Sequence, residues 1–243
     1  MKFNYKKYRN LIFSALAVAA SAAMIKYSMA QIDDAVYVSA SQSDDNSQII
    51  VLDSGHGGMD GGCSTADGIP EKGINLSIML SLRDMCRLYG YDVVCTRESD
   101  VSIYDSGVTG IRNQKISDME NRLELFNRYP DAVCLSIHQN NYTDPKYSGA
   151  QMFYSGANSE SERFAAIIQS AFVQNLQPDN TRETKLCGDE LYLCYYCDNP
   201  AVMAECGFLS NPDEAAKLTD ESYQQSVAFT LFTGINTFLN ERK

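Results

Sequence analysis

The sequence predicts an α/β fold, a single domain in which helices flank a mostly parallel sheet. Short apolar runs of strand length alternate with segments whose apolar residues recur at helical spacing. The connections between them are short, and no internal repeat interrupts the order. The chain has 243 residues, 44% of them hydrophobic and 21% charged, which is typical of one globular domain preceded by a leader.

The N-terminal segment differs from the rest of the chain. A basic stretch, residues 2–9, precedes an apolar run at residues 11–25, which is short for a spanning helix but suits a signal sequence. Ser28-Met29-Ala30 permits cleavage before Gln31, whereas Lys26, between the apolar run and this site, leaves open the alternative of an uncleaved membrane anchor. We therefore interpret residues 1–30 as a signal peptide or N-terminal anchor. Either form exports the domain to the outer face of the cytoplasmic membrane or to the cell wall.

The rest of the chain divides into a linker and a folded domain. Residues 31–48 are polar and predict a linker, and residues 49–243 predict the domain. The 20 basic and 31 acidic residues give a net charge of −11. The leader contains only basic charges, so the domain itself is more acidic still. This charge makes the domain a poor candidate for binding nucleic acid or anionic lipid, and we expect no nucleic-acid partner.

Strands and helices alternate in the first half of the domain. Apolar runs predict strands at residues 49–52, 92–96 and 132–137. A helix that ends at Gly90 and another that ends before Pro130 separate these strands. The apolar face of the first helix consists of Ile74, Ile78, Leu82 and Met85.

The second half continues the same alternation. Its predicted elements are a strand at 150–154, a helix at 164–176, strands at 191–193 and 201–204, and a closing helix at 227–238. Residues 98–115 form the longest irregular segment, and a loop of that length is often functional or mobile.

Eight cysteines in an exported chain raise the question of disulfide bonds. Cys86 lies on the apolar face of a predicted helix and Cys134 within a predicted strand, where a thiol behaves as a small hydrophobic group. Cys194 and Cys197 form a CxxC pair, but no second pair stands nearby to complete a zinc knuckle. We predict that most of these thiols are free. A Cys187–Cys194 or Cys194–Cys197 bridge and a redox role are the alternatives.

Both histidines of the chain follow apolar strands. His56 lies in a glycine loop after the first strand, and His138 ends the run at residues 132–137. Ligands of open α/β sheets bind at the edge that the carboxyl ends of the strands form. Glu71 opens the next helix, and Glu205 follows a strand directly, where a lone carboxylate is costly unless it serves a site. Two histidines and one carboxylate form a catalytic zinc shell, and a second carboxylate can act as general base.

Each of these residues also has a purely structural interpretation. A histidine after a strand is often a hydrogen-bonding loop residue, and Glu71 is an acid that the helix dipole favours at this position. Glu205 could pair with Arg97 or Arg122. The shared placement of the two histidines favours a metallohydrolase. Spacing alone does not decide which of the two carboxylates is the ligand.

Four ordered motifs resemble the zinc-dependent N-acetylmuramoyl-L-alanine amidases. They span roughly residues 49–240 and read IVLDSGHGG at 50–58, EKGINL at 71–76, SIHQN at 136–140 and ECGFLSN at 205–211. The segments NRL at 121–123 and SGAQMFY at 148–154 are most similar to the sporulation type, which trims spore-cortex peptidoglycan. Ser54 departs from the proline usual in the family, and Gln139 from a small residue.

The resemblance implies a six-stranded sheet flanked by helices and one Zn2+ per chain, held by His56, Glu71 and His138. It implies that Glu205 is the catalytic base for hydrolysis of the amide bond between N-acetylmuramic acid and L-alanine. Asn140, close to His138 in the sequence, is a candidate to bind substrate or to fix that histidine. The expected partners are peptidoglycan and a protein activator or regulator. The competing hypotheses are another zinc peptidoglycan hydrolase, such as a stem-peptide carboxypeptidase, and a non-catalytic wall-binding module, which would not need Glu205.

Overall fold

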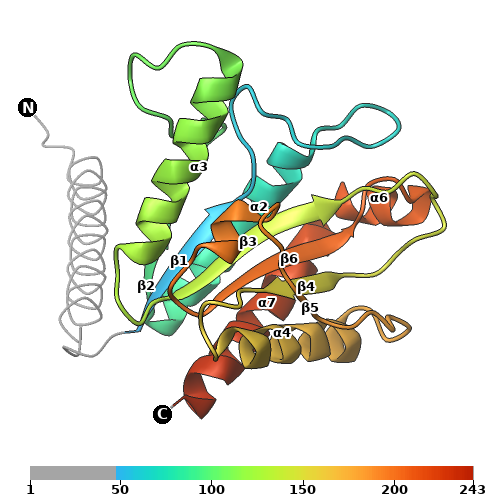
Figure 1. Cartoon of the computed structure of the whole chain (residues 1–243). Helices are drawn as coiled ribbons and strands as arrows, with labels where there is room; N and C mark the ends of the chain where they lie inside the picture. The colour runs from blue at the N-terminus through green and yellow to red at the C-terminus, as the bar shows by residue number, and fades with distance from the viewer. Residues whose placement is uncertain (1–47, 243) are drawn as a thin grey trace, which may run out of the picture. The chain divides into compact units, whose positions relative to one another are not determined.

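One sheet forms the centre of the domain in a computed structural model that describes residues 48–242 (Figure 1). Within this range the sheet has six strands in the order β2-β1-β3-β6-β4-β5. β4 pairs antiparallel with β6, and every other neighbouring pair is parallel. The expected six-stranded, mostly parallel sheet is thereby confirmed. The strands are β1 (Ile49–Ser54), β2 (Asp92–Cys95), β3 (Val133–Asn140), β4 (Gln151–Tyr154), β5 (Lys185–Leu186) and β6 (Ala201–Phe208).

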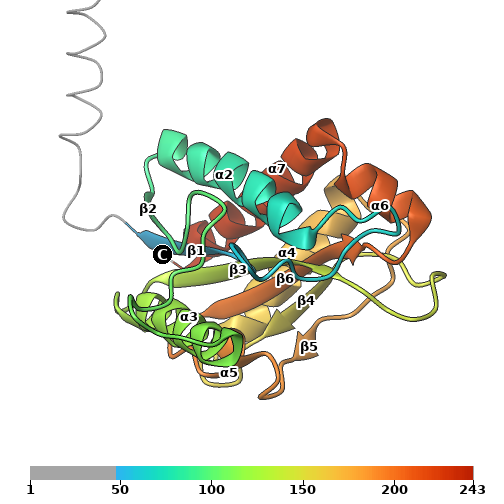
Figure 2. The same cartoon turned by 90° about the horizontal axis from the view of Figure 1, so that it is seen from above.

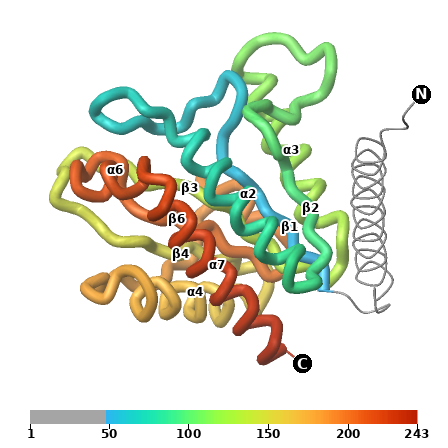
Figure 3. The backbone as a smooth tube through the Cα atoms, turned by 180° about the vertical axis from the view of Figure 1, so that it is seen from behind, coloured from blue at the N-terminus to red at the C-terminus, as the bar shows by residue number. Residues whose placement is uncertain are grey.

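Helices cover both faces of this sheet (Figure 2). Three helices, α2 (Glu71–Tyr89), α4 (Ser161–Asn175) and α7 (Glu221–Glu241), lie together on one face, as the view from behind shows (Figure 3). The short helix α6 (Pro212–Leu218) packs against α7 and β6. The opposite face carries α3 (Ile111–Asn127) and the single turn α5 (Tyr192–Tyr195).

The alternation of side chains along the strands builds two hydrophobic cores. Ile50 and Leu52 of β1 point to the core under α2, α4 and α7, whereas Val51 points to the smaller core under α3 and α5. All three residues are fully buried. This continuous burial is typical of parallel strands with helices on both faces.

Most elements lie where the apolar pattern predicts them, and Gly90 ends α2 in the left-handed conformation that glycine favours, with φ of 102°. The strand predicted at residues 191–193 is wrong. That segment leads into the turn α5, and the edge strand next to β4 is Lys185–Leu186 instead. Leu193 is buried in the smaller core, and a short buried apolar run does not distinguish a strand from a helical turn. The long loop is also shorter than predicted, because α3 begins at Ile111.

The interpreted leader, residues 1–30, and nearly all of the interpreted linker lie outside the residues that the structure describes. Between residues 48 and 242, no helix is long and apolar enough to cross a membrane. The anchor hypothesis therefore stays a prediction.

Candidate metal centre

His56, Glu71 and His138 converge at the carboxyl ends of β1 and β3. One oxygen of Glu71 lies 3.2 Å from Nε2 of His56, and the other lies 3.1 Å from Nδ1 of His138. One donor atom from each residue lies within 4.8 Å of the other two. Among the described residues this is the one group of three or more histidine, cysteine or acidic side chains with such spacing.

The backbone around the site is shaped for close approach. His56 itself has a φ of 62°, in the left-handed region that few residues other than glycine adopt. The His138 ring lies directly against the backbone of Gly55, where a Cβ atom would overlap its Cε1 and Nε2. A Cβ at Gly62 would lie 2.6 Å from Cδ2 of His56. Gly55 and Gly62 therefore make room for the imidazoles of His138 and His56.

Glu71 is held in place at the first residue of α2. One carboxylate oxygen accepts hydrogen bonds from the backbone N–H of Gln139 and the side-chain amide of Asn75, each at 3.0 Å. The other accepts from the backbone N–H of Cys63 at 3.0 Å and from its thiol at 3.2 Å. Burial by itself raises the pKa of Glu71, but the hydrogen bonds from His138 and His56 outweigh it and hold the pKa well below its usual range. Glu71 is therefore an ionised, oriented carboxylate.

A second carboxylate orients His56. Oδ2 of Asp60 lies 3.0 Å from Nδ1 of His56, and its Oδ1 accepts from Nζ of Lys115 at 2.9 Å. Burial lowers the pKa of His56, but its hydrogen bonds to Glu71 and Asp60 raise it to about 9. A carboxylate on the far nitrogen of an imidazole is the usual support of a metal-binding histidine. Because Asp60 lies against Nδ1 of His56, Nε2 is the ring nitrogen that faces Glu71 and is placed to bind a metal ion.

Glu205 lies beside this group on the neighbouring strand. It sits inside β6, in register with His138 of β3, so that β6 extends beyond the apolar run that predicts it. Its Oε2 is buried and has no hydrogen-bond partner among the described residues. Burial raises the pKa of Glu205 to about 7, with His138 opposing the shift. A buried carboxylate with a free oxygen and this pKa is suited to accept and return a proton near neutral pH.

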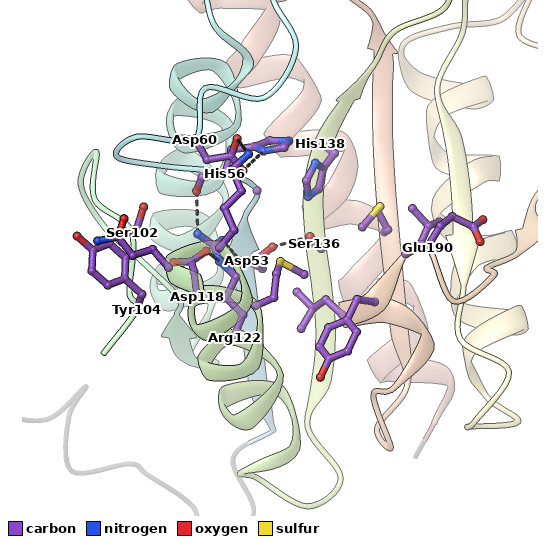
Figure 4. Close-up of a pocket in the computed structure, with 18 of the residues that line it drawn as sticks. Asp53, His56, Asp60, Ser102, Tyr104, Asp118, Arg122, Ser136, His138 and Glu190 are labelled. Atoms are coloured by element: carbon purple, nitrogen blue, oxygen red, sulfur yellow. Dashed lines mark hydrogen bonds and ion pairs between the residues drawn. The ribbon is translucent and has the colours of Figure 1, made fainter. Parts of the chain in front are cut away.

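The alternative that Glu205 pairs with Arg97 or Arg122 is wrong. Arg122 is 2% exposed, and its Nη1 lies 2.6 Å from Oδ1 of Asp53. Figure 4 shows Arg122 reaching from α3 to Asp53, below His56. Arg97 donates instead to backbone carbonyls, among them those of Ser54 and Gly55.

A cavity of about 330 Å³ opens beside these residues. His56, His138 and Glu205 all line it. Two separate parts of the chain contribute to its walls. One part includes Tyr104 and Lys115, and the other is the segment 190–193. The predicted irregular segment and the mispredicted strand thus both border the cavity.

The two remaining residue predictions have different outcomes. Asn140 ends β3, but its side chain makes no hydrogen bond to His138 within residues 48–242, and it does not line the cavity. The eight cysteines are all free, so neither proposed bridge is present, and six of the eight are buried. The thiol of Cys63, which is only partly buried, donates to Glu71.

The sequence reading also misses Asp60 and Asn75. Each lies four residues after a site residue, Asp60 after His56 and Asn75 after Glu71. For Asn75 the helical spacing is the signal that could identify it, since residues four apart share a helix face. For Asp60 the only signal is a carboxylate in the same glycine loop as the histidine.

The site chemistry fits a divalent metal ion. Two imidazole nitrogens and one carboxylate oxygen are the donor set of a catalytic zinc shell that keeps a position open. Glu205 lines the same cavity, and its buried Oε2 has no hydrogen-bond partner among the described residues. The residues present therefore fit the ion that the resemblance implies.

Comparisons with known proteins identify the family of the chain. The family model described as N-acetylmuramoyl-L-alanine amidase matches residues 50–237. The germination-specific N-acetylmuramoyl-L-alanine amidase of Bacillus subtilis is 36% identical over 195 residues, which covers 80% of this chain and 81% of that protein.

Solved structures of amidases are also similar to this chain. The CwlD amidase of Clostridioides difficile, in complex with the GerS lipoprotein, superimposes with a TM-score of 0.77 at 37% identity, covering 80% of this chain and 99% of that one. An N-acetylmuramoyl-L-alanine amidase from Clostridium difficile 630 has a TM-score of 0.70 at 26% identity and covers 82% of this chain and 100% of that one.

Proposed function

The chain belongs to the N-acetylmuramoyl-L-alanine amidase family, and from that premise we propose that it is a zinc enzyme of spore peptidoglycan. As an amidase of this family it hydrolyses the bond between N-acetylmuramic acid and L-alanine. The observation that carries the zinc proposal is the placement of the Glu71 carboxylate between His56 and His138, with Glu205 beside them. The products are a glycan strand without its peptides and free stem peptides.

In this proposal His56, Glu71 and His138 hold one zinc ion per chain. A bound zinc ion supplies a water of lowered pKa, about 7, and polarises the carbonyl that the water attacks. The ionised state of Glu71 and the support that Asp60 gives to His56 favour this donor set.

Glu205 is the general base. It accepts a proton from the water that attacks the lactyl carbonyl and returns this proton to the nitrogen of the departing L-alanine. Its pKa of about 7 places both protonation states within reach at neutral pH. Glu205 lines the cavity, and its Oε2, which has no hydrogen-bond partner among the described residues, is an available acceptor for that proton.

The proposed place of action is outside the cytoplasm. The substrate is peptidoglycan, and the interpreted leader at residues 1–30 would export the domain, either released or anchored through residues 11–25. The germination-specific relative supports a role in spore-cortex peptidoglycan. The structure of CwlD with the GerS lipoprotein supports a protein partner for this chain as well.

One experiment separates this proposal from its competitors. Purified peptidoglycan is digested with the metal-free protein, with and without one equivalent of zinc, and the products are identified by mass spectrometry. We expect zinc-dependent release of stem peptides that begin with L-alanine. Shortened stem peptides would indicate a carboxypeptidase, and binding without any cleavage would indicate a wall-binding module.

A further inference from the structure

Two buried arginines enclose the turn that carries His56. Arg122 donates from Nη1 to the carbonyl of Ser54 and from Nη2 to the carbonyl of His56, each at 2.8 Å. Arg97 donates from Nε to the same Ser54 carbonyl at 3.0 Å and from Nη2 to the carbonyl of Gly55 at 3.1 Å. Three consecutive carbonyls of the turn thus all accept from guanidinium groups.

This turn needs support that the sheet does not give. β1 ends at Ser54, and the chain then leaves the ladder with His56 at a φ of 62°. A residue other than glycine stays in this conformation only when its surroundings hold it there. Carbonyls buried beyond the end of a strand also need donors from outside the ladder. The two arginines meet both needs.

Arg97 also joins the segments of two proposed ligands. The same Nη2 that donates to Gly55, next to His56, donates to the carbonyl of Lys72, next to Glu71, at 2.8 Å. The approach is close, because a Cβ at Gly57 would lie 2.9 Å from Cδ and Nε of Arg97. A single planar group therefore sets the separation of the two segments.

Arg122 is fixed from the opposite side. Its Nη1 pairs with Asp53 at 2.6 Å, and its Nε pairs with Asp118 at 2.8 Å. Asp53 in turn accepts from Ser136 at 2.6 Å, on the strand that carries His138. The contacts of Arg122 therefore run from α3 through β1 to β3 (Figure 4).

We propose that Arg97 and Arg122 are positioning residues for the metal centre, which hold the turn at residues 54–56 so that His56 faces Glu71 and His138. Neither arginine donates to a proposed ligand side chain, and both act through the backbone. This inference rests on the proposed metal site and assigns the residues that set its geometry.

Lysine substitutions test the proposal, because lysine keeps the positive charge but has no planar fork to reach several carbonyls. The primary variant is Arg97→Lys in the full chain, which leaves the Asp53–Arg122 pair intact. Arg122→Lys is the second variant. The matched control is Ile235→Ala on α7, a fully buried core position, chosen because it destabilises the domain without touching the turn.

Zinc affinity is measured by competition with a chromophoric chelator, and amide hydrogen exchange is measured on the metal-free proteins. We expect Arg97→Lys to raise the zinc Kd at least tenfold and to speed exchange at residues 54–58. The control Ile235→Ala should have a lower melting temperature than the wild type, but its zinc Kd and its exchange rate at residues 54–58 should stay near the wild-type values.

The outcomes separate this inference from the proposed function. A wild-type protein that binds no zinc would contradict the proposed function, while the exchange measurement would still report on the turn. A folded Arg97→Lys variant with wild-type exchange and a zinc Kd within twofold of wild type would overturn the positioning role. Equal loss of zinc in Ile235→Ala would overturn it too, because the effect would then follow from stability alone.

Discussion

The imidazole of His138 lies against the backbone of Gly55, so closely that a Cβ at position 55 would overlap Cε1 and Nε2 of the ring. The glycine loop of β1 and the histidine of β3 are therefore fitted to one another. Glycine is required at position 55 because the His138 ring occupies the place of a Cβ atom. The backbone conformation does not require it, since Gly55 has no positive φ. A side chain at this position changes the site without removing any donor atom.

We predict that Gly55→Ala displaces His138 and lowers zinc affinity at least tenfold. Elemental analysis after dialysis against a weak chelator measures the zinc that remains. The control is Gly73→Ala, since Gly73 lies in α2 and a Cβ there meets nothing within 4 Å. Alanine is favoured over glycine in a helix by up to about 1 kcal/mol, so this variant should keep its zinc and be no less stable. Zinc retention by Gly55→Ala at the level of Gly73→Ala would refute the prediction.

Glu205→Gln should separate binding from catalysis. The substitution keeps the size of the side chain and leaves the three proposed ligands unchanged, but it removes the base. We expect wild-type zinc content and a fall of about 10²–10⁴ in the release of L-alanine amino termini from peptidoglycan. If zinc is lost together with activity, Glu205 is itself a ligand, and Glu71 becomes the candidate base.

Acid should destabilise the protein through Asp53. Burial raises the pKa of this carboxyl, but Arg122 and the hydrogen bonds from Ser136 and Thr96 outweigh it and hold the pKa below its ordinary value. A carboxyl with a lowered folded-state pKa contributes stability above its unfolded pKa of about 3.9, and this contribution is lost as the pH falls through the folded-state value. Urea unfolding of the wild type and of Asp53→Asn at pH 7 and pH 3 measures this contribution to the free energy of unfolding.

The variant should lose about 3–5 kcal/mol at pH 7, because it removes the buried carboxylate that pairs with Nη1 of Arg122 and leaves this buried guanidinium with Asp118 as its remaining charged partner. The difference from wild type should shrink at pH 3. The control Asp144→Asn breaks an exposed pair with Lys146 and should change stability by less than about 1 kcal/mol. A difference between wild type and Asp53→Asn that stays constant with pH would show that Asp53 does not titrate as described.

Thiol counting tests the role of the cysteines. All eight are free in the structure, and most pack in the two hydrophobic cores. Protein purified without reductant and then denatured should therefore react with a thiol reagent at six or more cysteines. Four or more cysteines locked in disulfides would contradict this and would make the bridges structural.

The sequence predicts the fold well where apolar runs alternate with helical spacing. β1, β3 and β6 are recognisable because both of their faces are buried, which makes each a continuous apolar run. The prediction fails at residues 191–193, where a short apolar run packs into a core as a helical turn. The edge strand Lys185–Leu186 has no apolar signal, because both of its residues are exposed.

The site is predicted in part for a similar reason. His56 and His138 can be found because they are the only two histidines of the chain and both follow strands. The contacts of Arg97 and Arg122 cannot be predicted in this way, because they depend on how the segment after β2 and helix α3 pack against the end of β1. The sequence offers Arg97 and Arg122 as partners for Glu205, whereas the fold directs them to the turn at residues 54–56. Spacing along the chain does not report such contacts.

X-ray absorption at the zinc edge tests the central claim most directly, with the protein loaded with one equivalent of zinc. The account predicts nitrogen and oxygen neighbours at about 2.0–2.2 Å, with the signature of two imidazoles and no sulfur neighbour. Cys63 donates to Glu71, so a thiolate ligand is the nearest rival to this donor set. A sulfur neighbour at about 2.3 Å would contradict a site made of His56, Glu71 and His138.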